Sequence, residues 1–175
     1  MEESMKQQGH GRTWILTILV SILVLGGACL ATGCSKNDSP GAVPAGASDP
    51  NGAGVREDVR AYIEATYPDS AKTRAALFQY AKVMEKALAD ASNKQLSIQH
   101  AEESNRASTC LLYIRTATDD AREVRLKLMP VVLNTDARNK AYFTYNDQLG
   151  GQVFMGIPYD QRVSACDINP STLPN

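Results

Sequence analysis

The sequence predicts an all-α protein: a small helical bundle or irregular helical array of about four to five helices, with an irregular C-terminal tail. Between residues 55 and 149, apolar side chains recur three or four positions apart, which is the period of one helix face. Short stretches rich in Pro, Ser, Asn or Gly separate these repeats. Prolines at positions 158, 170 and 174 predict the irregular tail from Ile157 onward.

The first two helices have the simplest patterns. A short helix presents Val55, Val59, Tyr62 and Ile63 on one face. Residues 67–70 end it, and Ser70 offers a cap for the next helix. That second helix is uninterrupted by Gly or Pro, and its apolar stripe consists of Leu77, Ala81, Met84 and Leu88.

A third helix is predicted from about Gln95 to Arg115. The apolar positions of its second half share one face: Ala107, Cys110, Leu111 and Ile114. Its first half, residues 97–106, is polar nearly all round, so we expect that part to be exposed or frayed.

Two further helices are expected before the tail. Asp120 and Glu123 have the spacing of a capping box that opens a fourth helix, and Pro130 should kink or end it. Apolar residues also alternate over 124–128, so a strand remains open there. Thr135-Asp136 caps a fifth helix, which Gly150-Gly151 ends. Its apolar residues are Ala141, Tyr142, Tyr145 and Leu149.

The N-terminal region has the pattern of an export signal. Residues 13–33 are uncharged and largely apolar, and Lys6, His10 and Arg12 precede them. The sequence Leu30-Ala31-Thr32-Gly33-Cys34 resembles the lipobox of bacterial lipoproteins, where small residues precede a cysteine that receives a diacylglyceryl group and becomes the N-terminus after cleavage. This resemblance implies lipidation at Cys34. A weaker box ends at Cys29, and an uncleaved transmembrane anchor of about 21 residues also fits the length.

The resemblance implies three segments: a signal peptide at 1–33, a lipid-anchored flexible linker at 34–54 and the helical domain at 55–175. The linker is made of Gly, Ala, Ser, Pro, Asn and Asp, and would reach about 25 Å as a coil. Ser35 after the cysteine is not Asp, which resembles outer-membrane sorting. We therefore expect a protein of the cell envelope that faces the periplasm, attached to membrane lipid through acylated Cys34, at the outer membrane rather than the inner one.

The cysteines agree with that location. Cleavage before Cys34 would remove Cys29 and commit Cys34 to lipid, leaving Cys110 and Cys166 as an even pair. Disulfides form and persist in oxidising compartments. The sequence therefore predicts a Cys110–Cys166 disulfide that staples the tail to the third helix.

The sequence contains no specific catalytic, cofactor or metal motif, so we predict a chain without catalytic residues, metal or cofactor. His100 and Glu103 could form half a metal site, but no second half has suitable spacing. Glu103-Ser104 resembles the catalytic Glu-Ser of lytic transglycosylases over those two residues only. The 18 basic and 19 acidic side chains are balanced, which argues against nucleic acid as a partner.

These observations favour a non-catalytic binding or assembly module that meets another envelope protein. Tyrosines are enriched at interfaces, so an aromatic cluster is the candidate partner surface. Its members are Tyr142, Phe143, Tyr145 and Phe154. An inhibitor or immunity-type lipoprotein is a second hypothesis, and a cell-wall hydrolase using Glu103 is a third.

Overall fold

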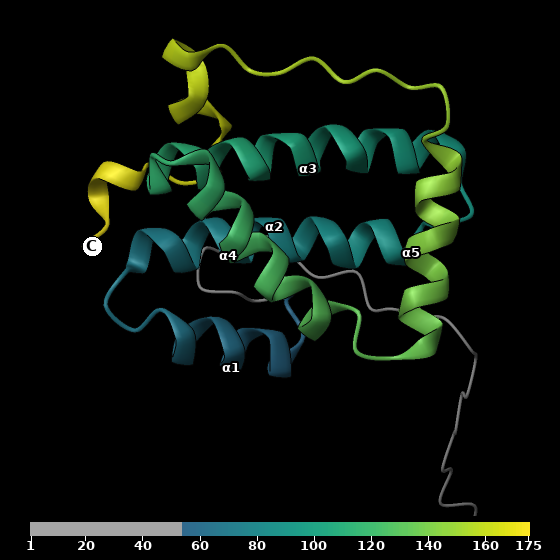
Figure 1. Ribbon diagram of the computed structural model, residues 1–175, viewed down its shortest axis with the longest axis horizontal. Helices are drawn as coiled ribbons and strands as arrows, with labels where there is room; N and C mark the ends of the chain where they lie inside the picture. Colours follow the sequence, from purple (N-terminus) through teal and green to yellow (C-terminus); the bar gives the residue numbers. More distant parts are fainter. Residues whose placement is uncertain (1–53) are drawn as a thin grey trace, which may run out of the picture. The chain divides into compact units, whose positions relative to one another are not determined.

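The computed structural model describes residues 54–175, and all regular structure in that part of the chain is helical (Figure 1). This confirms the predicted all-α fold. The predicted signal peptide, Cys34 and the linker up to residue 53 lie outside the described residues. None of the described helices combines the length and the apolar character that crossing a membrane requires. The elements are α1 (Glu57–Thr66), α2 (Ala71–Ala89), α3 (Lys94–Arg115), α4 (Thr118–Val132), α5 (Asp136–Gln148), and the 3-10 helices η1 (Tyr159–Ala165) and η2 (Pro170–Thr172).

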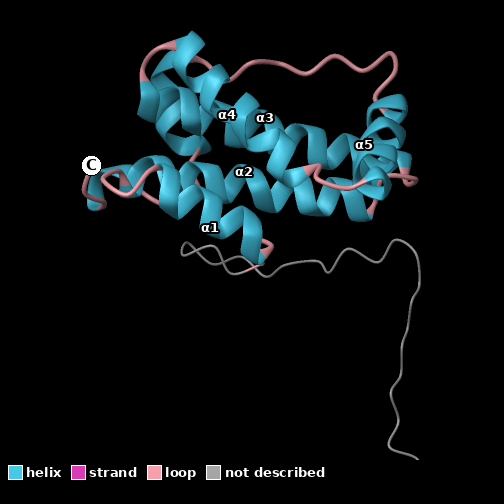
Figure 2. Ribbon diagram, turned by 60° about the horizontal axis from the view of Figure 1, so that its bottom comes forward, coloured by secondary structure: helices cyan, strands magenta, loops and turns pink. Residues whose placement is uncertain are grey.

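An antiparallel pair formed by α2 and α3 is the centre of the fold (Figure 1). The helices α1 and α4 pack against this pair and against each other, and α5 crosses one end of it (Figures 1 and 2). Polar side chains begin three of these helices, as their sequences favour. Ser70 accepts a hydrogen bond from the Thr73 amide, Asn93 from Leu96, and Thr135 from Arg138.

The main core lies where the apolar stripes of the first four helices meet. Its largest fully buried side chains include Ile63, Leu77, Met84, Leu111 and Leu128. Burying each such side chain contributes about 1.5–3 kcal/mol before the entropy of ordering is subtracted. The helical periodicity of the sequence therefore predicted the centre of this core correctly.

The first half of α3 contradicts the expectation of an exposed or frayed segment. The helix runs unbroken from Lys94, and the side chains of Ser97 and His100 are buried. They can be buried because α2 and the turn after it supply polar partners. Asp90 contacts the His100 ring, and the Ala91 carbonyl accepts a hydrogen bond from Ser97.

The ends of α4 also differ from the prediction. The helix begins at Thr118, with Ala117 as an N-cap that makes no side-chain bond, so the predicted capping box is wrong. The Asp120 carboxylate instead pairs with Arg115, its Oδ2 lying 2.6 Å from Nε. Pro130 lies in the last turn and removes one helical N–H, and α4 continues through it as far as Val132.

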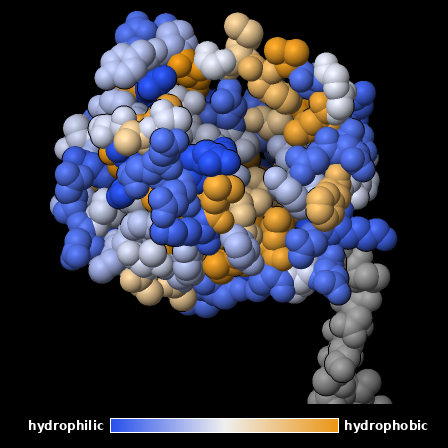
Figure 3. Space-filling view, viewed as in Figure 1, coloured by the Kyte–Doolittle hydropathy of each residue, from blue (hydrophilic) through white to orange (hydrophobic). Residues whose placement is uncertain are grey.

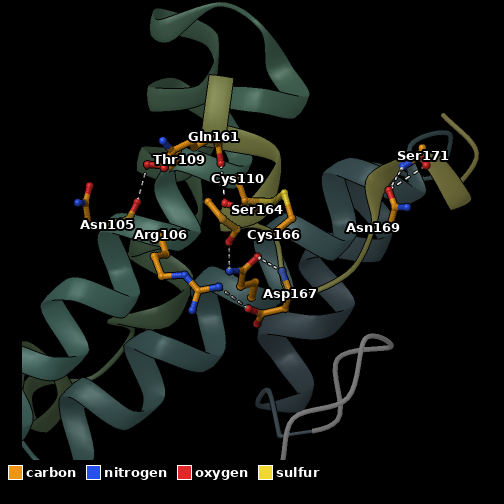
Figure 4. Close-up of a disulfide and its surroundings, with 12 residues drawn as sticks. Asn105, Arg106, Thr109, Cys110, Gln161, Ser164, Cys166, Asp167, Asn169 and Ser171 are labelled. Atoms are coloured by element: carbon orange, nitrogen blue, oxygen red, sulfur yellow. Dashed lines mark hydrogen bonds and ion pairs between the residues drawn. A yellow bond between two sulfur atoms is a disulfide. The ribbon is translucent and has the colours of Figure 1, made fainter. Parts of the chain in front are cut away.

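Gly151 helps to end α5 as predicted, with a left-handed φ of 77° that suits glycine. Residues 152–158 then run in extended form along α3 to η1 (Figure 1). The predicted disulfide is present: Cys110 of α3 and Cys166 have their Cα atoms 4.8 Å apart (Figure 4).

The Gln79 side chain holds the chain on both sides of Cys166. Its Nε2 donates to the Ala165 carbonyl at 2.9 Å, and its Oε1 accepts from the Asp167 amide at 3.2 Å. The tail is thus fixed to α2 and α3 by one covalent and two hydrogen bonds, although its own structure is irregular.

Candidate functional site

The four aromatic residues predicted to form a partner surface differ widely in exposure. Tyr145 is 5% exposed and belongs to the core, so its inclusion in a partner surface is wrong. Burial, followed by the nearby Tyr80 and Tyr142, raises the pKa of its phenol to about 12. Phe143 is 65% exposed, whereas Tyr142 and Phe154 are half-buried.

The tyrosines on α5 nevertheless form a connected row from the core to the surface. The Tyr142 ring lies 6.3 Å from the Tyr145 ring and 6.2 Å from the Phe143 ring, centroid to centroid. These are ordinary separations for tilted aromatic pairs. The spacing in the sequence predicted that Tyr142 and Tyr145 share a face, and Phe143 forms the exposed end of the row.

Two of the most exposed apolar side chains lie in the extended segment 152–158, of which only Phe154 was predicted to belong to a partner surface. Val153 is 86% exposed and Met155 is 82% exposed. Phe154, between them, packs instead against the small core cluster beneath α5. Figure 3 shows apolar residues along the edge of the molecule where this segment runs. The sequence signal was the run of three apolar residues Val153-Phe154-Met155. In an extended chain, Val153 and Met155 lie on one side and Phe154 lies on the other.

The backbone of this segment is also largely unpaired. The Asn105 side chain donates to the Met155 carbonyl at 2.8 Å and holds the segment against α3. Within residues 54–175, the amide groups of residues 153–157 have no hydrogen-bond acceptor. Extended backbone with free N–H groups can pair with a strand of another chain. The segment therefore combines apolar side chains with backbone donors that a partner could use.

The residues His100 and Glu103, considered above as half a metal site, belong to a chain of polar contacts. His100 Nε2 lies 2.8 Å from Asp90 Oδ2, and Glu103 Oε2 lies 3.5 Å from His100 Nδ1. The same Glu103 oxygen accepts a hydrogen bond from Lys86 at 3.0 Å. Three His, Cys, Asp or Glu side chains that could hold a metal ion together do not occur in the described part of the chain.

The electrostatics of Glu103 do not suit a general acid. Burial alone would raise its pKa, but hydrogen bonds from Lys86 and Gln99 outweigh burial, so the pKa is held below its usual range. A glycosidase acid needs the opposite shift, because it must keep its proton near neutral pH. The contacts of Glu103 instead join α2 to the first half of α3.

No protein-family model, no curated protein and no solved structure matches the chain.

Proposed function

We propose that the chain is a lipid-anchored envelope protein whose helical domain binds another envelope protein through the segment 152–158. One observation carries the binding proposal. Val153 and Met155 are more than four-fifths exposed on a segment whose backbone donors have no acceptor within residues 54–175. Burial of exposed apolar side chains and pairing of free backbone donors both lower the free energy. One protein partner can do both at once.

The geometry favours an extended strand of the partner as the element that is bound. A strand beside 152–158 would pair with its free amides and pack side chains against Val153 and Met155. The segment is already in the extended conformation that strand pairing requires, because Asn105, Phe154 and the disulfide fix it along α3. Little chain entropy would then be lost on binding.

Crosslinking in the native host tests the binding proposal. A photoreactive phenylalanine replaces Val153 in one version of the chain and the exposed Glu64 of α1 in a matched control. We expect one discrete protein adduct at position 153 that is absent at position 64. Met155→Asp should abolish the adduct without changing the melting temperature. Identical adducts at both positions, or none at position 153, would overturn the proposal.

The anchor rests on the lipobox-like residues 30–34, and an intact mass tests it separately. The protein is extracted from membranes of its host and weighed before and after reduction. We expect a chain that begins at Cys34 and carries lipid, and that gains two hydrogens when the Cys110–Cys166 disulfide is reduced. A full-length mass without lipid would favour an uncleaved transmembrane anchor instead.

The Glu103 carboxylate is paired with Lys86 and its pKa is lowered, which argues against a hydrolase that uses Glu103. If Glu103→Gln abolished a cell-wall cleaving activity while Lys86→Met spared it, the hydrolase hypothesis would return.

A further inference from the structure

Two adjoining cavities lie beneath the C-terminal residues, away from the segment 152–158. The first, of about 240 Å³, lies beside the Cys110–Cys166 disulfide, and the second, of about 390 Å³, opens toward η1. Lys72, Ile114 and Pro170 line both, so the two cavities are neighbouring parts of one recess.

The first cavity is mainly apolar. Its walls come from α2, from the end of α3 and from the tail, and include Ala75, Phe78, Ile114, Leu173 and the disulfide. At about 30 Å³ for each water-sized group, its volume of about 240 Å³ accommodates about eight such groups, the size of a ring or a short acyl chain. The carboxylate of Asp167, also in this wall, lies 3.9 Å from Arg106.

The second cavity is more polar than the first, although Leu112, Ile114 and Pro170 also line it. Its lining includes two cations, Lys72 and Arg162, four hydroxyl-bearing residues and Asn175, and no Asp or Glu side chain lines it. The hydroxyl-bearing residues are Tyr113, Thr116, Tyr159 and Ser171. It therefore offers donors and positive charge to an anion.

Neither cation has an anionic partner among the described residues. Arg162 contacts the face of the Tyr159 ring, with its guanidinium carbon 5.0 Å from the ring centroid. Its Nε is buried and has no hydrogen-bond acceptor within the described chain. An anion in the second cavity would instead form charge-assisted hydrogen bonds with the Lys72 ammonium and the Arg162 guanidinium.

We propose that this recess binds an amphipathic anion. Its carboxylate or phosphate lies at Lys72 and Arg162, and its acyl chain or ring enters the cavity beside the disulfide. The arrangement matches the usual build of a small-molecule site, in which apolar walls supply affinity and a few polar groups fix the orientation. This proposal does not depend on the protein partner proposed above, because the two surfaces share no residue.

Flow dialysis with radiolabelled octanoate tests the proposal. The full chain is placed in zwitterionic phosphatidylcholine vesicles, and binding to equal vesicles without protein is subtracted. We expect saturable binding of octanoate or octyl phosphate, and at least tenfold weaker binding of octanol, which has the same chain without the charge. The tighter of the two anions identifies the head group. Equal binding of octanol and octanoate, or no saturable binding of either anion, would overturn the proposal.

Substitutions locate the site. Lys72→Ala and Arg162→Ala should each weaken binding about tenfold, whereas Lys94→Ala, which removes an exposed charge elsewhere, should leave it unchanged. Ala75→Leu should block the apolar cavity, and an unchanged melting temperature would show that the variant folds.

A membrane source is distinguished by vesicle composition. If phosphatidylglycerol vesicles bound the chain through Lys72 and Arg162 while free octanoate and octyl phosphate did not bind, the two cations would serve a lipid surface. The proposed recess for a free amphiphile would then be wrong.

Discussion

The two ends of the α2–α3 pair are held together by different forces. At one end, the leucines of the main core and the Cys110–Cys166 disulfide join four helices and the tail. At the other end, where α5 crosses, the core cluster contains three alanines and Tyr145, and much of the contact is polar. There a buried ion pair joins Glu85 of α2 to Arg138 of α5 at 2.6 Å.

This difference determines how the stability of each end responds to substitutions. Apolar contacts are non-directional, and the loss of one group leaves a cavity whose cost depends on how far its neighbours relax. A buried ion pair fails abruptly, because removing one partner leaves an uncompensated charge in the interior. The α5 end should therefore be the more sensitive to a single polar substitution.

The largest effect is expected from loss of the disulfide. Replacing Cys110 and Cys166 by Ser should lower the free energy of unfolding by about 4 kcal/mol, because the unfolded chain regains a loop closed over 56 positions. Urea unfolding measures the loss, and reduced wild-type protein is the control. Hydrogen exchange should quicken more in residues 159–173 than in α5. A loss below about 1 kcal/mol would show that the hydrogen bonds of Gln79, and not the disulfide, fix the tail.

Breaking the buried ion pair is expected to have the second largest effect. Arg138→Met should cost about 3 kcal/mol, because Glu85 is left buried and charged, and the Val132 carbonyl loses a donor. The double variant Glu85→Leu, Arg138→Met should recover most of this loss, since two apolar groups can replace a buried pair. Equal destabilisation by the single and double variants would mean that apolar contacts, and not charge, hold this end.

The smallest effect is expected at Glu103, whose pKa is lowered in the folded protein. Its pairing stabilises the fold fully above about pH 4.5, the ordinary value, and the contribution is lost as the pH falls through the lower folded value. Glu103→Gln should therefore cost about 1 kcal/mol at pH 7 and much less at pH 2. Chemical unfolding at both values tests this, with the exposed Glu102→Gln as the control. A cost that did not shrink in acid would contradict the pairing.

The apolar end was predictable from sequence because its information is local. Leu77, Leu111 and Leu128 reveal their burial through helical spacing, and the Cys110–Cys166 pair was predicted once the lipobox resemblance had accounted for Cys29 and Cys34. The polar end was not predictable in this way. His100 looked exposed, because Asp90, the partner that permits its burial, lies in a different element.

The candidate sites show the same difference between local and long-range information. Phe143 was expected at a surface and is exposed there, whereas Tyr145 turned into the core because α5 lies across the end of α2. Lys72 and Arg162 carry no motif that joins them. Only the fold of the tail, held by the disulfide, brings these two cations to one recess. Lipidation at Cys34 stays a prediction.

The position of the disulfide has a consequence for the integrity of the chain. Extended, exposed backbone such as residues 152–158 is a preferred target of proteases. A cut there would separate η1 and η2 from the helices in covalent sequence, yet Cys166 would still tie the released piece to Cys110. The cleaved protein would remain one covalent molecule until the Cys110–Cys166 disulfide was reduced.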